Sequence, residues 1–97
     1  MRYDFTAIVW LSPGAAGWHF VTLPVALSAQ IRTLAGGLLT SFGSLRIIAQ
    51  IGDATWKTSL FADNKHNAFL LPVKADIRRR ANLAAGDEVS VAVELDL

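Results

Sequence analysis

Two basic side chains, Lys74 and Arg78, stand four residues apart on a segment that the sequence predicts to be helical. Residues at this spacing lie on one helix face, and a guanidinium can hold a carboxylate or a phosphate through two parallel N–H bonds. The pair therefore indicates an anion-binding site. The alternative, which we favour because paired charges are more often structural, is that Arg78 forms an ion pair with Asp87 or with a carboxylate of the last strand.

Two tryptophans, Trp18 and Trp56, are the other candidates for a binding site. An indole offers a large apolar surface and one N–H donor, so both could line the mouth of a ligand cleft. Packing in the core is the ordinary role of such residues. If a cleft exists, we expect it between the strands of these tryptophans and the helix of Lys74.

The sequence carries no motif for catalysis or for metal binding. With two histidines and no cysteine, a zinc site would need carboxylates at undefined spacing. A Gly-x-Ser-x-Gly motif and a phosphate-binding loop are both absent, and Glu94 and Asp96 are typical of the solvated face of a strand. We therefore expect no catalytic residue, no metal and no cofactor. An enzyme using His19 or His66 would require a deep pocket around that histidine.

The composition predicts one folded domain that spans residues 1–97. Hydrophobic residues make up 53% of the chain and charged residues 18%, which excludes a disordered tail. The net charge of +1 and the pI near 8.2 fall short of the value, above about 9, that is typical of nucleic-acid-binding domains. Nucleic acid is therefore not the expected partner, although four basic residues cluster within residues 74–80.

An uncharged run at residues 5–31 is long enough to raise the question of a membrane span. Pro13, Gly14 and Pro24 interrupt it, and the alternation within residues 3–10 is typical of a folded strand rather than of a signal peptide. The absence of cysteine is compatible with a reducing compartment. We expect no membrane partner and a cytoplasmic location.

Hydrophobic periodicity predicts a mainly β chain with two short helices. Alternating or continuous apolar runs predict strands at 3–10, 17–23, 68–71 and 89–95, and a hairpin at 45–61. Gly52 at the first central position of the hairpin turn favours type II′. Helical spacing predicts helices at 24–35 and 74–81, with apolar stripes at Leu27, Ile31, Leu34 and Leu38 and at Val73, Ile77 and Ala81.

An internal echo relates the two strand-to-helix connections. The stretch at 20–25 ends in Leu-Pro-Val and precedes Ile31-Arg32, and the stretch at 69–73 ends in the same way and precedes Ile77-Arg78. The echo suggests strand–helix–strand halves related by a pseudo-two-fold, with Arg32 in the place of Arg78. Since closure protects short strands from exposed edges, we expect a small closed or semi-closed β-barrel of six to seven strands.

Large apolar residues also fall on the faces opposite the expected core. Ile8, Trp10, Ile48 and Phe61 occupy such positions. Apolar surface of this kind is typical of a subunit interface or a ligand cleft, so we expect a homo-oligomer.

Five blocks along the chain resemble the family known as domain of unknown function 1905. They lie at residues 17–24, 42–46, 56–61, 71–78 and 86–89, in the same order as in the family. The resemblance implies a small β-barrel with helices, found in microbial proteins either alone or ahead of a bacteriocin-protection-type domain; a chain that ends at Leu97 looks like a stand-alone, bacterial member. The family has no established activity, so no catalytic residue is implied.

These features favour a non-catalytic module that binds a small molecule or a protein, with Trp18, Trp56, Lys74 and Arg78 as the candidate binding residues. A nucleic-acid-binding barrel that resembles swapped-hairpin transcription regulators is the alternative. An uncharacterised enzyme is a third hypothesis.

Overall fold

The computed structural model describes residues 1–14, 16–39 and 43–96. Most of the predicted elements are present in it, although the predicted first strand is divided at Val9. The elements in chain order are β1 (Arg2–Ile8), β2 (Trp10–Leu11), β3 (His19–Thr22), α1 (Val25–Ala35), the 3-10 helix η1 (Gly36–Leu38), β4 (Ser44–Ile51), β5 (Ala54–Asp63), β6 (Ala68–Pro72), α2 (Ala75–Ala81) and β7 (Glu88–Leu95).

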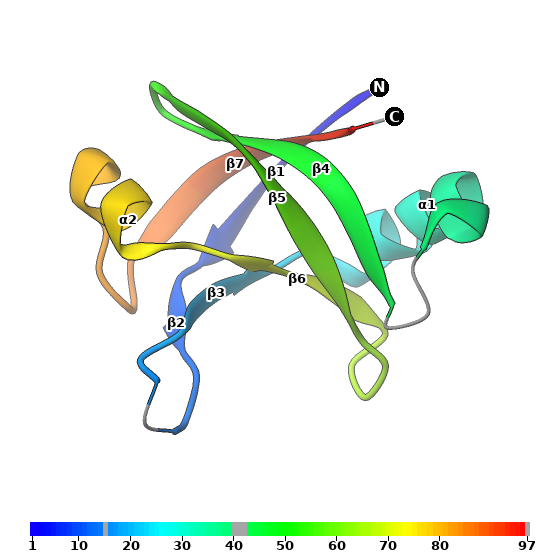
Figure 1. The fold of residues 1–97 in the computed structure, drawn as a ribbon. Helices are drawn as coiled ribbons and strands as arrows, with labels where there is room; N and C mark the ends of the chain where they lie inside the picture. The colour runs from blue at the N-terminus through cyan, green and yellow to red at the C-terminus, as the bar shows by residue number, and fades with distance from the viewer. Residues whose placement is uncertain (15, 40–42, 97) are drawn as a thin grey trace.

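The strands form one antiparallel sheet in the order β1-β7-β4-β5-β6-β3-β2. Its two ends, β1 and β2, are consecutive in the chain and are separated only by Val9, whose N–H donates to the carbonyl of Asp87 at 2.9 Å and whose carbonyl accepts from Gly86 N–H at 2.7 Å. Because one bent segment supplies both ends, the sheet curls into a semi-closed barrel (Figure 1). The predicted mainly β barrel with two α-helices is confirmed.

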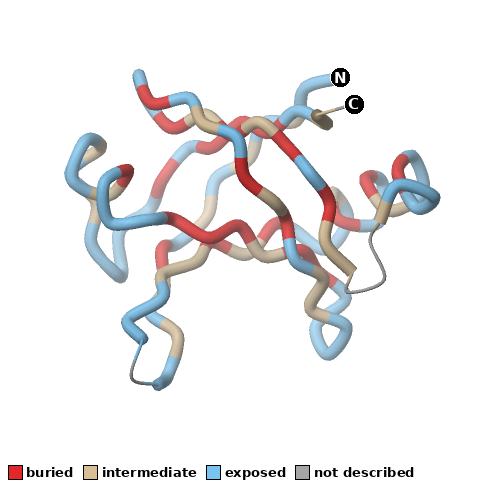
Figure 2. The backbone as a smooth tube through the Cα atoms, in the orientation of Figure 1, coloured by how far each residue is buried: buried red, intermediate tan, exposed pale blue. Residues whose placement is uncertain are grey.

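The core lies inside the curl, where the inward faces of the strands meet. Buried and exposed residues alternate along β4, β5 and β7, as the period of two predicts (Figure 2). In the hairpin turn Gly52 has a φ of +55° and Asp53 does not have a positive φ, which agrees with the predicted type II′ turn. The largest fully buried side chains come from β3, α1, β4, β5, β6 and β7 and from residues next to the strands, so the sheet and helix α1 share one core.

Strands β3 and β6 pair around Val21 and Leu71, and this pairing relates two halves of the chain. Just beyond the paired residues, Leu23 N–H donates to the carbonyl of Phe69, and Val73 N–H donates to the carbonyl of His19, both at 2.9 Å. The two bonds are equivalent: the donors, Leu23 and Val73, are 50 residues apart, and so are the acceptors, His19 and Phe69. Helix α1 begins at Val25 and α2 at Ala75, the same shift, and the helices lie on opposite sides of the barrel (Figure 1).

The pseudo-two-fold is therefore present, but the predicted alignment of the halves is wrong. The shared Ile-Arg pair equates Arg32 with Arg78, a shift of 46 residues, and the shared Leu-Pro-Val stretch is shifted by 48. The backbone bonds instead show a shift of 50, which equates Ser28 with Arg78. The reason lies in the connections: Pro72 is the last residue of β6, whereas Pro24 lies beyond the end of β3. The prediction that Arg32 takes the place of Arg78 fails for the same reason.

Helix α1 closes one side of the barrel through a buried serine. Ser28 is 1% exposed, and its Oγ accepts the N–H of Phe69 at 3.0 Å. The guanidinium of Arg32 covers the ring of Phe69, with its carbon 5.3 Å from the ring centroid, a distance suited to a cation–π contact. Ser28 and Arg32 thus both contact Phe69, which is fully buried at this junction.

This contact also corrects the predicted stripe of α1. The buried residues are Ser28, Ile31 and Ala35, whereas Leu34 and Leu38 are more than half exposed. Because the buried N–H of Phe69 requires an acceptor, the helix turns the Ser28 face inward and leaves these two leucines outside.

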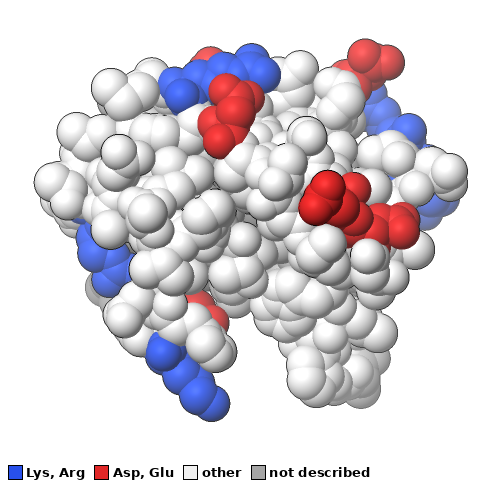
Figure 3. Space-filling model, turned by 180° about the vertical axis from the view of Figure 1, so that it is seen from behind, with Lys and Arg blue, Asp and Glu red and all other residues white. Residues whose placement is uncertain are grey.

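The outer surface carries dispersed charge and several apolar side chains. On the face seen in Figure 3, the basic side chains lie in separate places rather than in one patch. Ile8 and Phe61 are exposed and Trp10 and Ile48 are half-buried, all on outward faces; self-association through them stays a prediction. Among the described residues, no helix has both the length and the apolar character needed to cross a membrane.

We predict that Ser28→Ala lowers the free energy of unfolding by roughly 1–2 kcal/mol, because it leaves the buried N–H of Phe69 without an acceptor. Alanine is the better helix former by a few tenths of a kcal/mol, so propensity alone predicts the opposite sign. Urea unfolding measures the change. Thr33→Ala is the matched control, since Thr33 lies on the exposed side of α1 and should change stability by less than about 0.5 kcal/mol. Equal effects of the two substitutions would contradict the prediction.

Candidate functional site

The pseudo-equivalent junction at α2 is not packed shut but holds a cleft. A space of about 330 Å³ opens between the start of β3 and the start of α2. Among the described residues, its lining comes from the segment before β3, from the end of β6 and from α2: Ala16, Gly17, Trp18, His19, Pro72, Val73, Lys74, Ala75 and Arg78. Three of the four predicted binding residues therefore meet in one cleft.

Arg78 is held by a backbone carbonyl rather than by a carboxylate. Its Nη1–H donates to the carbonyl of Val73 at 2.7 Å. The predicted ion pair with Asp87 or with the last strand is wrong, because Asp87 Oδ2 accepts the N–H of Ala84 at 2.8 Å in the turn after α2, and no carboxylate of the described chain lies within 4 Å of Arg78. The guanidinium is thus oriented while its charge remains unneutralised.

Lys74 adds a second positive charge to the same cleft. It is exposed, stands immediately before α2, and forms no ion pair with the described residues. The described part of the lining includes no aspartate or glutamate. Two cations without a carboxylate attract an anion, and the half-buried position of Arg78 reduces solvent screening of that attraction.

Trp18 forms the apolar wall of the cleft. Its side chain is 53% exposed, and its ring stacks on Phe20 with centroids 5.9 Å apart and an interplanar angle of 17°. Phe20 is in turn supported by Trp10, whose Nε1–H donates to Thr22 Oγ1 at 2.9 Å. One face of the Trp18 ring is therefore supported by protein, and the ring can offer flat apolar surface to a ligand.

His19 also lines the cleft and is not one of the four predicted binding residues. Its Nδ1 lies 2.9 Å from the carbonyl oxygen of Gly17. The signal was available in the run Gly17-Trp18-His19, which places a polar ring beside the tryptophan. The spacing of residues in the sequence does not predict the role of His19, because the approach of β3 to α2 is a property of the fold.

Trp56 does not belong to this cleft. It lies on the inward face of β5, is half-buried, and packs against the core. Its Nε1–H is buried and has no hydrogen-bond partner among the described residues. The expectation that both tryptophans border one cleft does not hold, because the inward and outward faces of the curled sheet separate them.

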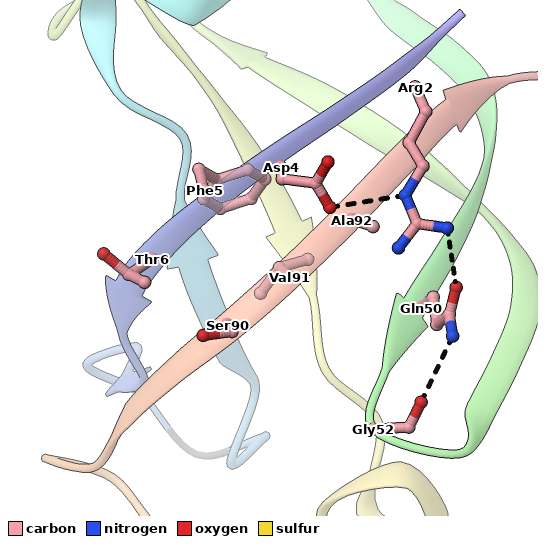
Figure 4. Close-up of a pocket in the computed structure, with 9 residues that line it drawn as sticks. All are labelled: Arg2, Asp4, Phe5, Thr6, Gln50, Gly52, Ser90, Val91 and Ala92. Carbon is pink, nitrogen blue, oxygen red and sulfur yellow. Dashed lines mark hydrogen bonds and ion pairs between the residues drawn. The ribbon is translucent and has the colours of Figure 1, made fainter.

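A larger depression lies on the outer face of β1, β7 and β4, with a volume of about 590 Å³ (Figure 4). Arg2 crosses the small Ala92 there: its Nε–H donates to Asp4 Oδ1 at 3.3 Å and its Nη1–H to Gln50 Oε1 at 3.2 Å. Gln50 completes the chain by donating to the carbonyl of Gly52 at 3.3 Å. These groups satisfy one another and Asp4 neutralises Arg2, so the smaller cleft is the stronger candidate.

The chain was compared with models of known protein families. Residues 5–93 match the family described as domain of unknown function (DUF1905). The chain belongs to the DUF1905 family. No curated protein matches it significantly. The cleft residues Trp18, His19, Lys74 and Arg78 all lie within the matched region, so the candidate site is part of the DUF1905 domain itself.

The second histidine of this DUF1905 domain lies in the turn between β5 and β6. His66 Nδ1 is 2.7 Å from Asp63 Oδ2, and this hydrogen bond, assisted by charge attraction, holds the pKa of the Asp63 carboxyl below its ordinary value. The described residues contain no group of three or more His, Asp or Glu side chains placed to hold a metal ion. His66 does not line the cleft.

We predict that His66→Ala raises the pKa of the Asp63 carboxyl toward its ordinary value of 3.8. In the folded protein the pKa is lowered, so the pair stabilises the fold above the unfolded pKa, and this stabilisation is lost as the pH falls through the folded pKa. A carbon-detected NMR titration of the side-chain carboxyl measures the shift. His19→Ala is the control and should leave the Asp63 titration unchanged; an unaltered pKa in His66→Ala would refute the assignment of its cause.

Proposed function

We propose that this DUF1905 domain is a binding module whose cleft takes a small ligand with an anionic group and a flat apolar group. The observation that carries the proposal is the pairing of Lys74 and Arg78, without a neutralising carboxylate, opposite the supported ring of Trp18. The cations would hold the anionic group and the indole would hold the flat group. About 330 Å³ is at the small end of the range for ligand sites.

Binding is favoured over catalysis by the contents of the cleft. His19 and Lys74 are the titrating side chains there that general acid–base or nucleophilic chemistry uses, and the described lining offers neither a hydroxyl group nor a carboxylate. The ring of His19 is oriented by the Gly17 carbonyl, but the described lining gives it no hydroxyl to activate as a nucleophile. The same residues are well suited to recognition.

Nucleic acid is a weaker candidate partner. The net charge is +1, and the basic side chains on the face seen in Figure 3 do not gather into a continuous patch. The described lining of the cleft holds two cationic side chains, whereas an extended nucleic-acid strand would need a cationic track along its backbone. A ligand that carries one anionic group fits the distribution of charge better.

We predict that benzoate and phenyl phosphate bind in the cleft and that benzyl alcohol, which lacks the charge, binds at least tenfold more weakly. Arg78→Met should weaken anion binding by about tenfold or more, since a charge-assisted hydrogen bond contributes about 1.5–3 kcal/mol. Lys74→Met should weaken it about two- to fivefold, because Lys74 is exposed and screened. Amide and indole N–H shifts in two-dimensional NMR measure both affinity and location.

Arg79→Met is the matched control for charge, since Arg79 is exposed on the same helix and does not line the cleft. Its affinity should equal that of the unaltered protein. Because Arg78 also donates to Val73, urea unfolding of Arg78→Met checks that the fold persists, and Lys74→Met tests the charge without that bond. If no anion binds, or if Lys74→Met, Arg78→Met and Arg79→Met behave alike, the proposal is wrong.

A further inference from the structure

The orientation of His19 fixes which of its nitrogens can meet a ligand. Nδ1 lies 2.9 Å from the carbonyl oxygen of Gly17, and a carbonyl oxygen can only accept a hydrogen bond. The proton must therefore be on Nδ1. In the neutral ring Nε2 is then an acceptor, and in the protonated ring it becomes a second donor.

Nε2 is also exposed to solvent. His19 is half-buried and lines the cleft. Two buried side-chain nitrogens of the described residues have no hydrogen-bond partner, and they are Arg32 Nη2 and Trp56 Nε1. His19 Nε2 forms no hydrogen bond with the residues that the structure describes and is not one of these buried atoms, so part of its surface is open to solvent.

The cleft thus offers two cationic donors, Lys74 and Arg78, and one nitrogen that accepts when neutral. These three side chains are the titratable groups of the described lining. An ionised carboxylate has only acceptor atoms, so it opposes a neutral Nε2 and gains from it only after the ring is protonated. A phosphate diester likewise has no acidic proton that it could donate to a neutral Nε2.

A phosphate monoester is different because its second pKa is about 6, so one acidic proton is available near neutral pH. As a monoanion it can donate its P–O–H to Nε2 while two other oxygens accept from Lys74 and Arg78. As a dianion it can accept from a protonated Nε2. In both cases one proton lies between a phosphate oxygen and Nε2, so the lone pair of Nε2 does not face a lone pair of the phosphate oxygen.

We propose that the cleft recognises a phosphate monoester that carries a flat apolar substituent, and that His19 Nε2 discriminates it from carboxylates and phosphate diesters. This proposal rests on the proposed function, since it specifies the ligand of the same cleft. It also accounts for the asymmetry of the two halves: His19 and Arg78 stand where the closed junction has Phe69 and Ser28.

Three probes with the same phenyl group test it at one pH near 6.5: phenyl phosphate, methyl phenyl phosphate and benzoate. The diester keeps the phosphorus centre and a negative charge but has no P–O–H. Phenyl phosphate should bind at least tenfold more tightly than either of the others, as measured by isothermal titration calorimetry with NMR shifts to place the ligand.

His19→Asn is the decisive variant. Its side-chain N–H can replace Nδ1–H toward the Gly17 carbonyl, whereas no atom replaces Nε2. The preference for the monoester should fall below threefold in this variant and remain unchanged in His66→Asn, which alters the histidine outside the cleft.

The outcomes separate the two proposals. Binding of all three probes in the cleft with no preference, or with a preference that His19→Asn retains, overturns the assignment of Nε2 and leaves the binding module standing. Failure of all three probes to bind overturns the binding module and the monoester assignment together. A preference that disappears only in His19→Asn supports both.

Discussion

The antiparallel pairing of β3 with β6 is the constraint on which the rest of the structure depends. Two equivalent backbone bonds extend this pairing at both ends, one from Leu23 to Phe69 and one from Val73 to His19. Each bond fixes the chain two residues before a helix begins. They place α1 and α2 on opposite sides of the barrel (Figure 1). The bent segment of β1 and β2 then brings the two ends of the sheet together, because it pairs with β7 along its first part and with β3 along its second.

Equivalent backbones carry different side chains, and that difference separates scaffold from site. At the α1 junction, Ser28 satisfies a buried N–H and Phe69 fills the space. At the α2 junction, Arg78 turns back to the carbonyl of Val73, so its side chain does not fill the corresponding space and a polar cleft remains. The buried residues of the first junction contribute to stability through packing, whereas the unneutralised charge at the second is free to bind an anion.

Electrostatic neutralisation distinguishes this cleft from the larger outer depression. Arg2 is paired with Asp4 and hydrogen-bonded to Gln50, so an incoming anion would have to displace protein partners (Figure 4). Arg78 keeps its position through a neutral carbonyl, which orients the guanidinium without cancelling its charge. Trp18 is also held by an uncharged neighbour, since its ring stacks on Phe20. Both side chains are therefore positioned before a ligand arrives, which reduces the entropy lost on binding.

Local pattern was enough to predict most of the elements, the inward faces of β1, β4 and β7, and three residues of the candidate site. Alternation along residues 89–95 and the Gly52 turn are properties of neighbouring residues, so the sequence by itself determined them. The partner of Arg78, the inward side of α1, the separation of Trp56 from Trp18 and the approach of His19 to α2 were decided only by the tertiary structure. Each depends on contacts between residues distant in sequence, and the strand pairing and the curl that create those contacts leave no local periodicity.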